Sequence, residues 1–258
     1  MGHPLLDLTG KMAVVIGGTS GIGLALARDL ARAGADVVPT GRRTDLVRKA
    51  AAEIAALGRR SLARTCDVTD NASLEDLLTS VRAEFGRVHI LVNSAGRIKR
   101  MPTLNFPDEE WDAIQETNLK GTLRACRVFG RHMIENRYGR IINVGSLTCF
   151  VGLYEVAAYA ASKAGVAALT RSLAVEWATF GVCVNALVPG VVRTDMNAAL
   201  LDGTERGKEF LLRTPMKRYA KAEELGGAAV FLASDAASFV TGQLLAVDGG
   251  FLASGVNQ

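Results

Sequence analysis

The stretch MAVVIGGTSGIGLALARDLARAG, residues 12–34, decides the fold class of this chain. It begins with the apolar run MAVVI, which has the pattern of a strand buried on both faces. A glycine-rich turn from Gly17 to Gly23 follows, and the residues after the turn have the apolar spacing of an amphipathic helix. A strand, a glycine-rich turn and a helix in this order predict the first unit of a dinucleotide-binding α/β fold.

Further short runs rich in apolar and β-branched residues recur along the chain, and each is expected to be a strand. They are residues 35–40, 61–66, 88–92, 140–144, 182–188 and 244–247. Longer segments with helical spacing separate them, so we expect right-handed crossovers and a parallel sheet. No composition break or repeat divides the chain. The sequence predicts one domain over residues 1–258, a Rossmann fold with a doubly wound, mostly parallel, seven-stranded sheet and helices on both faces.

Pro39 breaks the pattern of the second predicted strand. Proline has no N–H group, and interior strands of parallel sheets rarely tolerate it. We therefore expect the hydrogen-bond ladder to be interrupted at Pro39, close to the end of that strand.

Composition and charge exclude several classes of protein. The net charge of +4 is spread along the chain, and no run of five like charges occurs, which argues against nucleic-acid partners and membrane surfaces. The first residues do not resemble a secretory signal, and no apolar stretch is long enough to span a bilayer, so we expect a cytoplasmic protein. The four cysteines, at positions 66, 126, 149 and 183, have no metal-ligand spacing and are expected to be buried free thiols.

The glycine-rich turn is a candidate site for the pyrophosphate of a dinucleotide. Glycines let the backbone approach phosphate groups, and the start of the next helix offers free N–H groups and the positive end of its dipole. Tight turns also use glycine, so the motif is weak alone, but its position between a strand and a helix strengthens it. The residues expected to line this site are Gly17, Thr19, Ser20, Gly21, Ile22 and Gly23.

The end of the second strand indicates which dinucleotide is preferred. An acidic residue about 20 positions after the glycine turn would bind the ribose 2′-hydroxyl of NAD, whereas a basic residue would suit the 2′-phosphate of NADP. Here the chain reads Thr40-Gly41-Arg42-Arg43, without a carboxylate. Arg42 and Arg43 are alternatively solvated surface charges. The missing acid favours NADP(H), and NAD(H) stays possible.

Tyr159 and Lys163 are the candidate proton-transfer groups. They are four residues apart and so share one face of a helix. A free tyrosine has a pKa of about 10, and a fixed cation nearby favours the phenolate and lowers that pKa. Such a pair is alternatively a surface coincidence. Ser146 lies 13 residues earlier, just after a predicted strand, where a ligand of an open α/β sheet would bind.

In their order and spacing, these segments resemble the short-chain dehydrogenase/reductase family over essentially the whole chain. The matching segments are Gly17-x-x-x-Gly21-x-Gly23, Asp67-Val68, Asn93-Ser94-Ala95-Gly96, Asn118, Ser146, Tyr159-x-x-x-Lys163 and Pro189-Gly190. The resemblance implies an NAD(P)-dependent oxidoreductase that moves a hydride between nicotinamide and a carbonyl or secondary alcohol carbon.

The resemblance also implies roles for individual residues. Tyr159 would be the general acid/base, Lys163 would lower its pKa and hold the nicotinamide ribose, and Ser146 would position the carbonyl. Asn118 would carry a water that relays protons to Lys163. The other cofactor contacts would be Asp67 on the adenine amine, Thr194 on the carboxamide, and Val68, Asn93, Ala95, Gly96, Pro189, Gly190 and Val192 along the dinucleotide.

Two positions depart from the family pattern. Ile16 stands where a threonine usually precedes the glycine turn, and Ser94 stands where a second asparagine is common. The first departure predicts the loss of one supporting hydrogen bond near Asn93.

Two long helices are expected over about 108–136 and 156–179. The second carries small residues such as Ala160, Ala164, Ala167 and Ala168. The resemblance implies that these helices pair between copies, and we expect a homotetramer. A single chain would alternatively bury these residues against its own sheet.

The substrate is less clearly specified. Residues 190–215 are the expected substrate lid, and they mix apolar with polar side chains. The segments Arg213-Thr214-Pro215, Glu223-Glu224-Leu225 and Val247-Asp248-Gly249-Gly250 resemble the gluconate 5-dehydrogenase branch, which favours a sugar acid or polyol. Sister branches share these segments, so a 3-oxoacyl-carrier-protein reductase is the alternative. A dinucleotide-binding regulator without turnover is the alternative of a different class.

Overall fold

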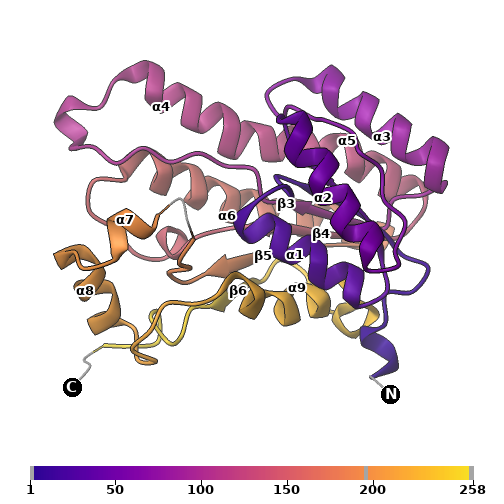
Figure 1. Cartoon of the computed structure of the whole chain (residues 1–258). Helices are drawn as coiled ribbons and strands as arrows, with labels where there is room; N and C mark the ends of the chain where they lie inside the picture. Colours follow the sequence, from indigo (N-terminus) through magenta and orange to yellow (C-terminus); the bar gives the residue numbers. More distant parts are fainter. Residues whose placement is uncertain (1–2, 195–196, 256–258) are drawn as a thin grey trace.

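Parallel strands form one sheet in this computed structural model, which describes residues 3–194 and 197–255. In spatial order the strands of the described residues are β2, β1, β3, β4, β5 and β6 (Figure 1). Their bounds are β1 Met12–Ile16, β2 Asp36–Thr40, β3 Ile90–Asn93, β4 Gly139–Val144, β5 Val182–Pro189 and β6 Leu244–Val247. The strand order reverses between β1 and β3, and open α/β sheets bind their ligands beyond the carboxyl ends of the strands at such a reversal.

Helices cover both faces of the sheet, as the sequence predicts. On one face α1 packs with α9, and on the other α3 packs with α5 and α5 with α6 (Figure 1). The helices are α1 Gly21–Arg32, α2 Thr44–Ala56, α3 Asn71–Phe85, α4 Asp108–Gln115, α5 Gly121–Glu135, α6 Ala157–Trp177, α7 Ala198–Leu201, α8 Glu205–Arg213 and α9 Gly226–Ala233. The doubly wound α/β architecture is therefore confirmed.

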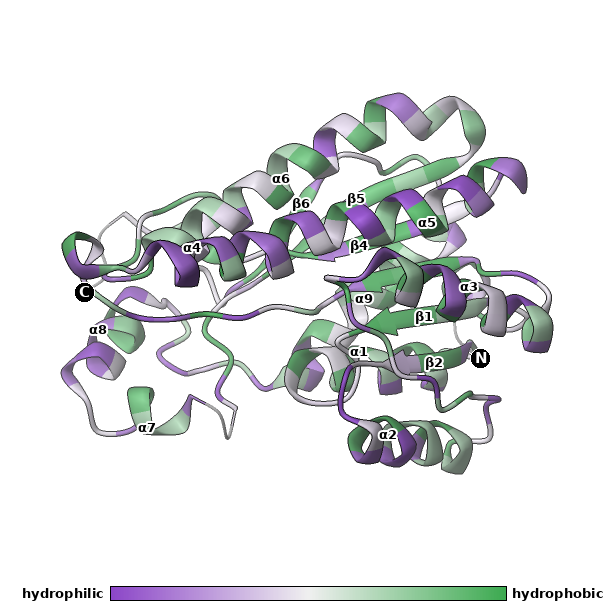
Figure 2. Cartoon of the chain, turned by 90° about the horizontal axis from the view of Figure 1, so that it is seen from above, coloured by the Kyte–Doolittle hydropathy of each residue, from purple (hydrophilic) through white to green (hydrophobic). Residues whose placement is uncertain are grey.

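The core consists of two apolar layers, one on each face of the sheet. Successive residues of β1 alternate between them: Ala13 and Val15 pack with α1 and α9, whereas Met12, Val14 and Ile16 pack with α3 and α5. The strands are continuous apolar runs because both of their faces are buried. Figure 2 shows this for β1, which is hydrophobic along its length. Within the described ranges, no helix is long and apolar enough to cross a membrane.

The third predicted strand, residues 61–66, is wrong, and the sheet has six strands instead of seven, because this segment runs beside β2 without forming a ladder. In β2 the amide of Asp36 donates toward β1, and the next amide, that of Val37, donates outward to the carbonyl oxygen of Arg60 at 3.1 Å. Successive amides of a strand alternate between its two neighbours. The nitrogen of Pro39 therefore faces the 61–66 segment, and it has no hydrogen to donate.

Pro39 leaves the inner ladder intact, which corrects the expected interruption. Its partner in β1 is Val15, in continuous register, because the donors of this ladder are the residues on either side of the proline. The interruption occurs only on the outer side of β2. Beyond Pro39, the amide of Cys66 donates to the carbonyl oxygen of Gly41 at 3.0 Å. Isolated hydrogen bonds therefore hold the 61–66 segment beside β2.

The two predicted long helices are present with one irregularity. The first is α4 and α5 joined by a π-helical turn at Glu116–Lys120, and the second is α6, which continues into a 3₁₀ turn at Ala178–Phe180. Isolated π-helical turns inside α-helices often occur at functional sites. This turn contains Asn118.

Candidate active site

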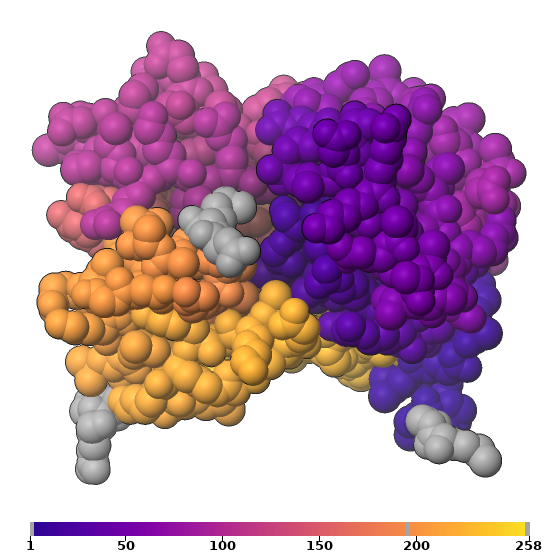
Figure 3. Space-filling model, viewed as in Figure 1, coloured from indigo at the N-terminus to yellow at the C-terminus, as the bar shows by residue number. Residues whose placement is uncertain are grey.

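The predicted site residues meet at the carboxyl ends of the strands. The glycine turn follows β1, Arg42 and Arg43 follow β2, and the 93–96 segment ends β3 and continues beyond it. Ser146 follows β4, and the 189–194 segment ends β5 and continues into the lid. In Figure 3 the helices of the predicted lid, α7 and α8 (orange), lie between the segment that carries α4 (magenta) and the C-terminal chain (yellow). The parallel sheet thus brings distant parts of the sequence to one edge.

The glycine turn is closed toward the sheet and open toward the site. A Cβ atom on Gly17, where φ is 77°, would lie 2.5 Å from the backbone nitrogen of Ala95. A Cβ atom on Gly23 would lie 2.1 Å from the carbonyl oxygen of Gly17, so larger residues are excluded at both positions. For Gly21 the nearest atom would be the Thr194 methyl group, at 3.9 Å. A pyrophosphate that needs close backbone approach fits this turn.

The start of α1 supplies favourable electrostatics for a phosphate. Its N-cap residue, Ser20, makes no side-chain capping hydrogen bond to the helix. The N–H groups of the first helical residues and the positive end of the helix dipole therefore face the turn, and both favour a bound anion. Arg43 Nη2 donates to the Ser20 hydroxyl at 3.5 Å, so a guanidinium group lies next to the turn.

Arg42 and Asp67 lie at the adenosine end of the predicted site. The side chain of Arg42 is 77% exposed, and its Nη1 lies 3.9 Å from Asp67 Oδ2. Asp67 Oδ1 accepts hydrogen bonds from the amide and hydroxyl of Thr69 at 2.9 and 2.8 Å. Burial raises the pKa of the Asp67 carboxyl, but the bonds from Thr69 and the charge of Arg42 outweigh it, and the pKa is lowered. Asp67 is thus a charged acceptor suited to an amine.

Ser146, Tyr159 and Lys163 lie together where β4 ends and α6 begins. The Ser146 hydroxyl accepts from the amide of Thr148 at 3.2 Å and lies close enough to the Tyr159 phenol to act on its pKa. Lys163 is buried, and its Nζ donates to the carbonyl oxygen of Val144 at 2.7 Å. The same Nζ lies 5.7 Å from the centroid of the Tyr159 ring. The hydroxyl, phenol and ammonium predicted from sequence are therefore neighbours.

The pKa shifts in this group differ from the sequence expectation. Burial raises the pKa of the Tyr159 phenol, and the nearby Ser146 hydroxyl opposes that effect. The expected lowering by Lys163 is not found, because its Nζ is directed to the carbonyl oxygen of Val144. Burial lowers the pKa of Lys163 to about 8. This lysine therefore exchanges its proton closer to neutral pH than an exposed lysine does.

Asn118 connects the loop after β3 to α6. Its Nδ2 donates to the carbonyl oxygen of Arg97 at 2.9 Å and to the Ser162 hydroxyl at 3.0 Å. Its Oδ1 accepts from the amide of Arg97 at 2.8 Å. A Cβ atom on Gly96 would lie 3.5 Å from Asn118 Oδ1 and 3.9 Å from Lys163 Nζ. The buried amide of Asn118 thus holds the loop after β3 against α6.

Asn93 has one satisfied and one unsatisfied side-chain atom. Its Nδ2 donates to Asn143 Oδ1 at 2.9 Å, whereas its buried Oδ1 has no hydrogen-bond partner among the described residues. Ile16, which replaces the usual threonine, is in register with Asn93 on the neighbouring strand. The predicted loss of a hydrogen bond near Asn93 is confirmed.

The remaining predicted cofactor residues fall into two groups. Val68 and Val192 are 7% and 4% exposed and belong to the core, so only their backbones can face a ligand. Pro189 ends β5, and Gly190 packs so closely on β6 that a Cβ atom there would lie 2.6 Å from Asp248 Cα. The amide of Thr194 donates to the side-chain oxygen of Asn197 at 2.8 Å, which fixes the start of the lid.

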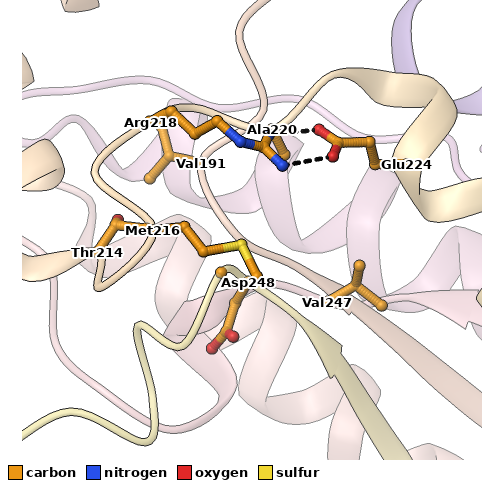
Figure 4. Close-up of a pocket in the computed structure, with 9 residues that line it drawn as sticks. Val191, Thr214, Met216, Arg218, Ala220, Glu224, Val247 and Asp248 are labelled. Atoms are coloured by element: carbon orange, nitrogen blue, oxygen red, sulfur yellow. Dashed lines mark hydrogen bonds and ion pairs between the residues drawn. The ribbon is translucent and has the colours of Figure 1, made fainter.

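A cavity of about 180 Å³ lies beside the ends of β5 and β6 (Figure 4). Arg218 and Glu224 join across its rim through hydrogen bonds of 2.7 and 2.6 Å. The wall is formed by Val191, Thr214, Met216, Arg218, Ala220, Glu224, Val247, Asp248 and Gly249. None of the predicted catalytic or cofactor residues belongs to this wall, but Val191 and Thr214 lie in the predicted lid. The cavity lies beside the segment that links the predicted lid to α9.

Sequence reasoning missed polar residues behind the group formed by Ser146, Tyr159 and Lys163. Asn143 Nδ2 donates to Thr170 Oγ1 at 2.9 Å, and both side chains are fully buried. The Ser162 hydroxyl donates to the carbonyl oxygen of Tyr159 at 2.7 Å. The asparagine in an otherwise apolar strand end, Ile-Ile-Asn-Val, was an available signal. All four cysteines are free as expected, but Cys149 is only half-buried.

Comparison with known proteins places the chain in a family. Residues 17–252 match the sequence profile of a family described as Enoyl-(Acyl carrier protein) reductase. The 2-dehydro-3-deoxy-D-gluconate 5-dehydrogenase of Bacillus subtilis is 39% identical over 250 residues, which cover 97% of this chain and 98% of the relative. The 3-oxoacyl-acyl-carrier-protein reductase of Escherichia coli is 40% identical over 245 residues, which cover 95% and 98% of the two chains.

Solved structures agree with this result. A gluconate 5-dehydrogenase of Burkholderia cenocepacia in complex with NADP and tartrate superimposes with a TM-score of 0.93 at 36% identity, covering 97% of this chain and 98% of that one. A protein of Beutenbergia cavernae with bound NADP at low occupancy gives a TM-score of 0.92 at 46% identity, covering 97% and 100%. The site and these likenesses define an α/β oxidoreductase. The chain belongs to the short-chain dehydrogenase/reductase family.

Proposed function

We propose that this chain interconverts a secondary alcohol and a ketone on a sugar acid, with NADP(H) as the hydride carrier. The observation that carries the proposal is the meeting of Ser146, Tyr159 and Lys163 beside the glycine turn. When bound, the nicotinamide supplies or accepts the hydride. The protein residues have to bind the two reactants, orient them and move the proton.

The residues of the carboxyl edge are suited to hold the dinucleotide along its whole length. The glycine turn and the start of α1 would bind the pyrophosphate, and Arg42 would bind the 2′-phosphate. Asp67 would accept from the adenine amine, since its lowered pKa keeps it charged. At the nicotinamide end, Lys163 would hold the ribose and Thr194 the carboxamide.

Tyr159 would exchange the proton of the substrate oxygen while Ser146 holds that oxygen. In alcohol oxidation Tyr159 accepts the hydroxyl proton, and in ketone reduction it donates a proton to the same atom. The closeness of Ser146 to Tyr159 supports this role, because the Ser146 hydroxyl opposes the effect of burial on the phenol pKa. Lys163, with a pKa of about 8, would return the proton through a water carried by Asn118.

Arg206, from helix α8 of the predicted lid, suits an anionic substrate at the entrance to α6. Its guanidinium group donates to the carbonyl oxygen of Tyr154 at 3.2 Å, whereas Arg100 is already paired with Glu155, with its Nε 2.7 Å from Glu155 Oε2. The segment that contains Tyr154 leads directly into the helix of Tyr159. A guanidinium group can bind a carboxylate through two parallel hydrogen bonds, which is the group that distinguishes a sugar acid from a neutral ketone. The named sugar-acid dehydrogenases among the relatives support this substrate class.

A substrate comparison tests the proposal. Initial rates of NADPH oxidation would be measured with 5-ketogluconate and with an acetoacetyl thioester, and rates of NADP reduction with gluconate. We expect the sugar acids to have the higher kcat/KM. A faster reaction of the thioester would reassign the chain to 3-oxoacyl reduction, which the relative from Escherichia coli makes the second candidate. Tight NADPH binding without turnover of any ketone would support the non-catalytic alternative.

The proposal includes assembly into a cytoplasmic homotetramer through α5 and α6. On α6, Ala164 and Ala168 are exposed and Val175 is 81% exposed, whereas Ala167 packs in the chain's own core. These exposed residues are separated by helical spacing and would pack between copies. Light scattering at micromolar concentration should give four times the chain mass, and a monomer would contradict the proposed assembly.

A further inference from the structure

Two hydrogen bonds and one close approach of side chains join β4 and the residues after it to α6 at three successive levels. Along β4 the chain runs toward Ser146, and along α6 it runs away from Tyr159, so the two elements are paired in opposite directions. The three contacts are Asn143 with Thr170 at 2.9 Å, the Val144 carbonyl oxygen with Lys163 Nζ at 2.7 Å, and Ser146 with Tyr159. The residue numbers rise on β4 while they fall on α6, as this pairing requires.

The Asn143–Thr170 contact is the level farthest from the reacting atoms, and it is fully satisfied. Asn143 Oδ1 accepts from Asn93 Nδ2 at 2.9 Å, and Asn143 Nδ2 donates to Thr170 Oγ1. Thr170 in turn donates to the carbonyl oxygen of Val166 at 2.8 Å. Both Asn143 and Thr170 are 0% exposed. A buried polar group that loses its partner is costly, so this contact strongly prefers one geometry.

Thr170 and the catalytic residues lie on the same face of α6. Tyr159, Lys163, Val166 and Thr170 are spaced at i, i+4, i+7 and i+11, which places them in one stripe facing the sheet. Thr170 is two helical turns beyond Lys163, about 10 Å along the axis. Because a helix moves as a rigid body over this distance, a contact that fixes Thr170 also fixes the rotation and axial position of Tyr159.

We propose that Asn143 and Thr170 are positioning residues, which set the register of α6 on β4 and thereby hold the Tyr159 hydroxyl against Ser146. Neither residue touches the reacting atoms; each acts through the helix. The inference rests on the proposed function of Tyr159 as the acid/base. Proton transfer requires close placement, and a displacement of about 1 Å can reduce a rate by about 100-fold.

The experiment compares Thr170→Val, which keeps the shape and removes the hydroxyl, with Thr170→Ser, which keeps the hydroxyl. For Thr170→Val we expect kcat to fall by about 10- to 100-fold, while the Kd of NADPH stays within about threefold of the parent. The pH at half-maximal kcat/KM for alcohol oxidation should rise, since a looser contact with Ser146 leaves the phenol less acidic. Thr170→Ser should restore both kcat and the pH profile to within about threefold.

A matched control separates positioning from a general loss of packing. The hydroxyl of Thr241, in the turn before β6, accepts from the amide of Val184 on β5 at 3.1 Å and takes no part in the three contacts between β4 and α6. Thr241→Val should therefore lower thermal stability to a similar extent and leave kcat and the pH profile unchanged. Should Thr170→Val fail to fold, Thr170→Ala, which also lacks the hydroxyl, serves for the same comparison at lower temperature.

Two results would overturn the positioning role. One is a variant without the Thr170 hydroxyl whose kcat and pH profile stay within about twofold of the parent, and the other is an equal loss of kcat in Thr241→Val. The proposed function itself is tested separately by Tyr159→Phe. If Tyr159→Phe is fully active, the assignment of the acid/base is wrong; if it is inactive and Thr170→Val is not, only the positioning role is lost.

Discussion

The two ends of β4 hold two buried cations with different partners. At the amino end, Arg140 is 5% exposed; it lies 3.3 Å from Asp235, donates to the carbonyl oxygen of Ser234 at 3.2 Å and covers the ring of Tyr138. At the carboxyl end, Lys163 donates to one carbonyl oxygen, and no carboxylate in the described part of the chain pairs with it. Charge is compensated at the first end and left uncompensated at the second.

This difference between the two ends of β4 assigns the amino end to stability and the carboxyl end to function. A compensated cation serves the fold, because its charge and hydrogen bonds are satisfied within the protein. An uncompensated buried cation costs free energy, and natural proteins keep such costs mainly where they act on a ligand. The amino end of the sheet should therefore respond to mutation through stability, and the carboxyl end through activity and cofactor binding.

The largest expected effect is at the carboxyl end. Tyr159→Phe keeps the ring and removes the exchangeable proton, so kcat should fall by about 100-fold or more. The Kd of NADPH should stay within a few-fold, and the melting temperature should hardly change. Steady-state kinetics and fluorescence titration check these values. Retention of more than about a tenth of the activity would argue against Tyr159 as the acid/base.

Cofactor preference should change next most strongly. Arg42→Ala removes a guanidinium group expected to bind the 2′-phosphate, so NADPH should bind about 10- to 150-fold more weakly while NADH is nearly unaffected. Gly41→Asp should weaken NADPH binding further, because its carboxylate would repel the 2′-phosphate. The Thr19 hydroxyl lies 3.3 Å from the position of the added Cβ atom. The dissociation constants of NADPH and NADH, measured for each variant, test this prediction. An equal loss for NADH and NADPH in Arg42→Ala would mean that the arginine stacks on the adenine instead.

At the amino end, Arg140→Met should affect stability alone. The change leaves the carbonyl oxygen of Ser234 and the carboxylate of Asp235 without this donor, at a cost of about 2 kcal/mol, or about 4–8 °C in Tm. The kcat should stay within about twofold, because the residue is at the opposite end of β4 from Ser146. Lys208→Met, in an exposed ion pair with Glu205, is the control and should change Tm little. A large loss of kcat at unchanged Tm would contradict the division between the two ends.

A pH effect should also come from the amino end. The ring nitrogen Nδ1 of His89 accepts from the amide of Met12 at 2.9 Å, and burial, with the charges of Arg87 and Lys11, lowers the pKa of His89 to about 4. The unfolded chain takes up this proton near pH 6.5, whereas the folded chain does so only near pH 4. Stability contributed by His89 is therefore present above pH 6.5 and is lost as the pH falls toward 4.

His89→Asn keeps an acceptor for the Met12 amide and removes the titrating group. We expect the decrease in Tm between pH 7 and pH 5 to be smaller in this variant than in the parent. His3→Asn, at an exposed position, should follow the parent curve. Parallel Tm curves for His89→Asn and the parent would show that other groups set the acid sensitivity.

The smallest expected effect returns to the carboxyl end, at Ile16. Ile16→Thr and Ile16→Val each remove about the volume of one methyl group. Only threonine adds a hydrogen-bond donor next to the unpaired Asn93 Oδ1. In most protein cores the variant with valine would be the more stable of the two. Here we expect Ile16→Thr to be more stable than Ile16→Val by about 1 kcal/mol. Denaturant unfolding of the pair measures the difference, and the usual order would show that the oxygen is not accessible to residue 16.

Much of the fold was predictable from the sequence, and the failures have a physical cause. The strands at residues 12–16 and 244–247 match their predicted bounds, because a continuous apolar run marks a strand both in the buried β1 and in the partly exposed edge strand β6. The segment at 61–66 was misassigned, since the effect of Pro39 depends on which way its nitrogen points, and that direction follows only from strand register. A local pattern predicts that a strand exists; it does not say which neighbour its amides face.

The candidate site shows the same limit. Tyr159 and Lys163 were recognisable because their spacing lies within one helix and the family resemblance assigned their roles. The link from Asn143 to Thr170 joins two elements, 27 residues apart, and no spacing rule connects an asparagine in a strand with a threonine in a helix. The lowered pKa of Lys163 likewise comes from burial, which sequence pattern reports only for apolar residues.

Pro39 has a consequence for the behaviour of this protein at high concentration. β2 is an edge strand, and an exposed edge with a full row of free amides is a template on which another chain can add a strand and start an aggregate. The proline removes a donor from the middle of that row, and the 61–66 segment lies over part of the rest. The residue that interrupts the outer side of β2 thereby also makes this edge a poorer template for pairing between molecules than an unbroken edge would be.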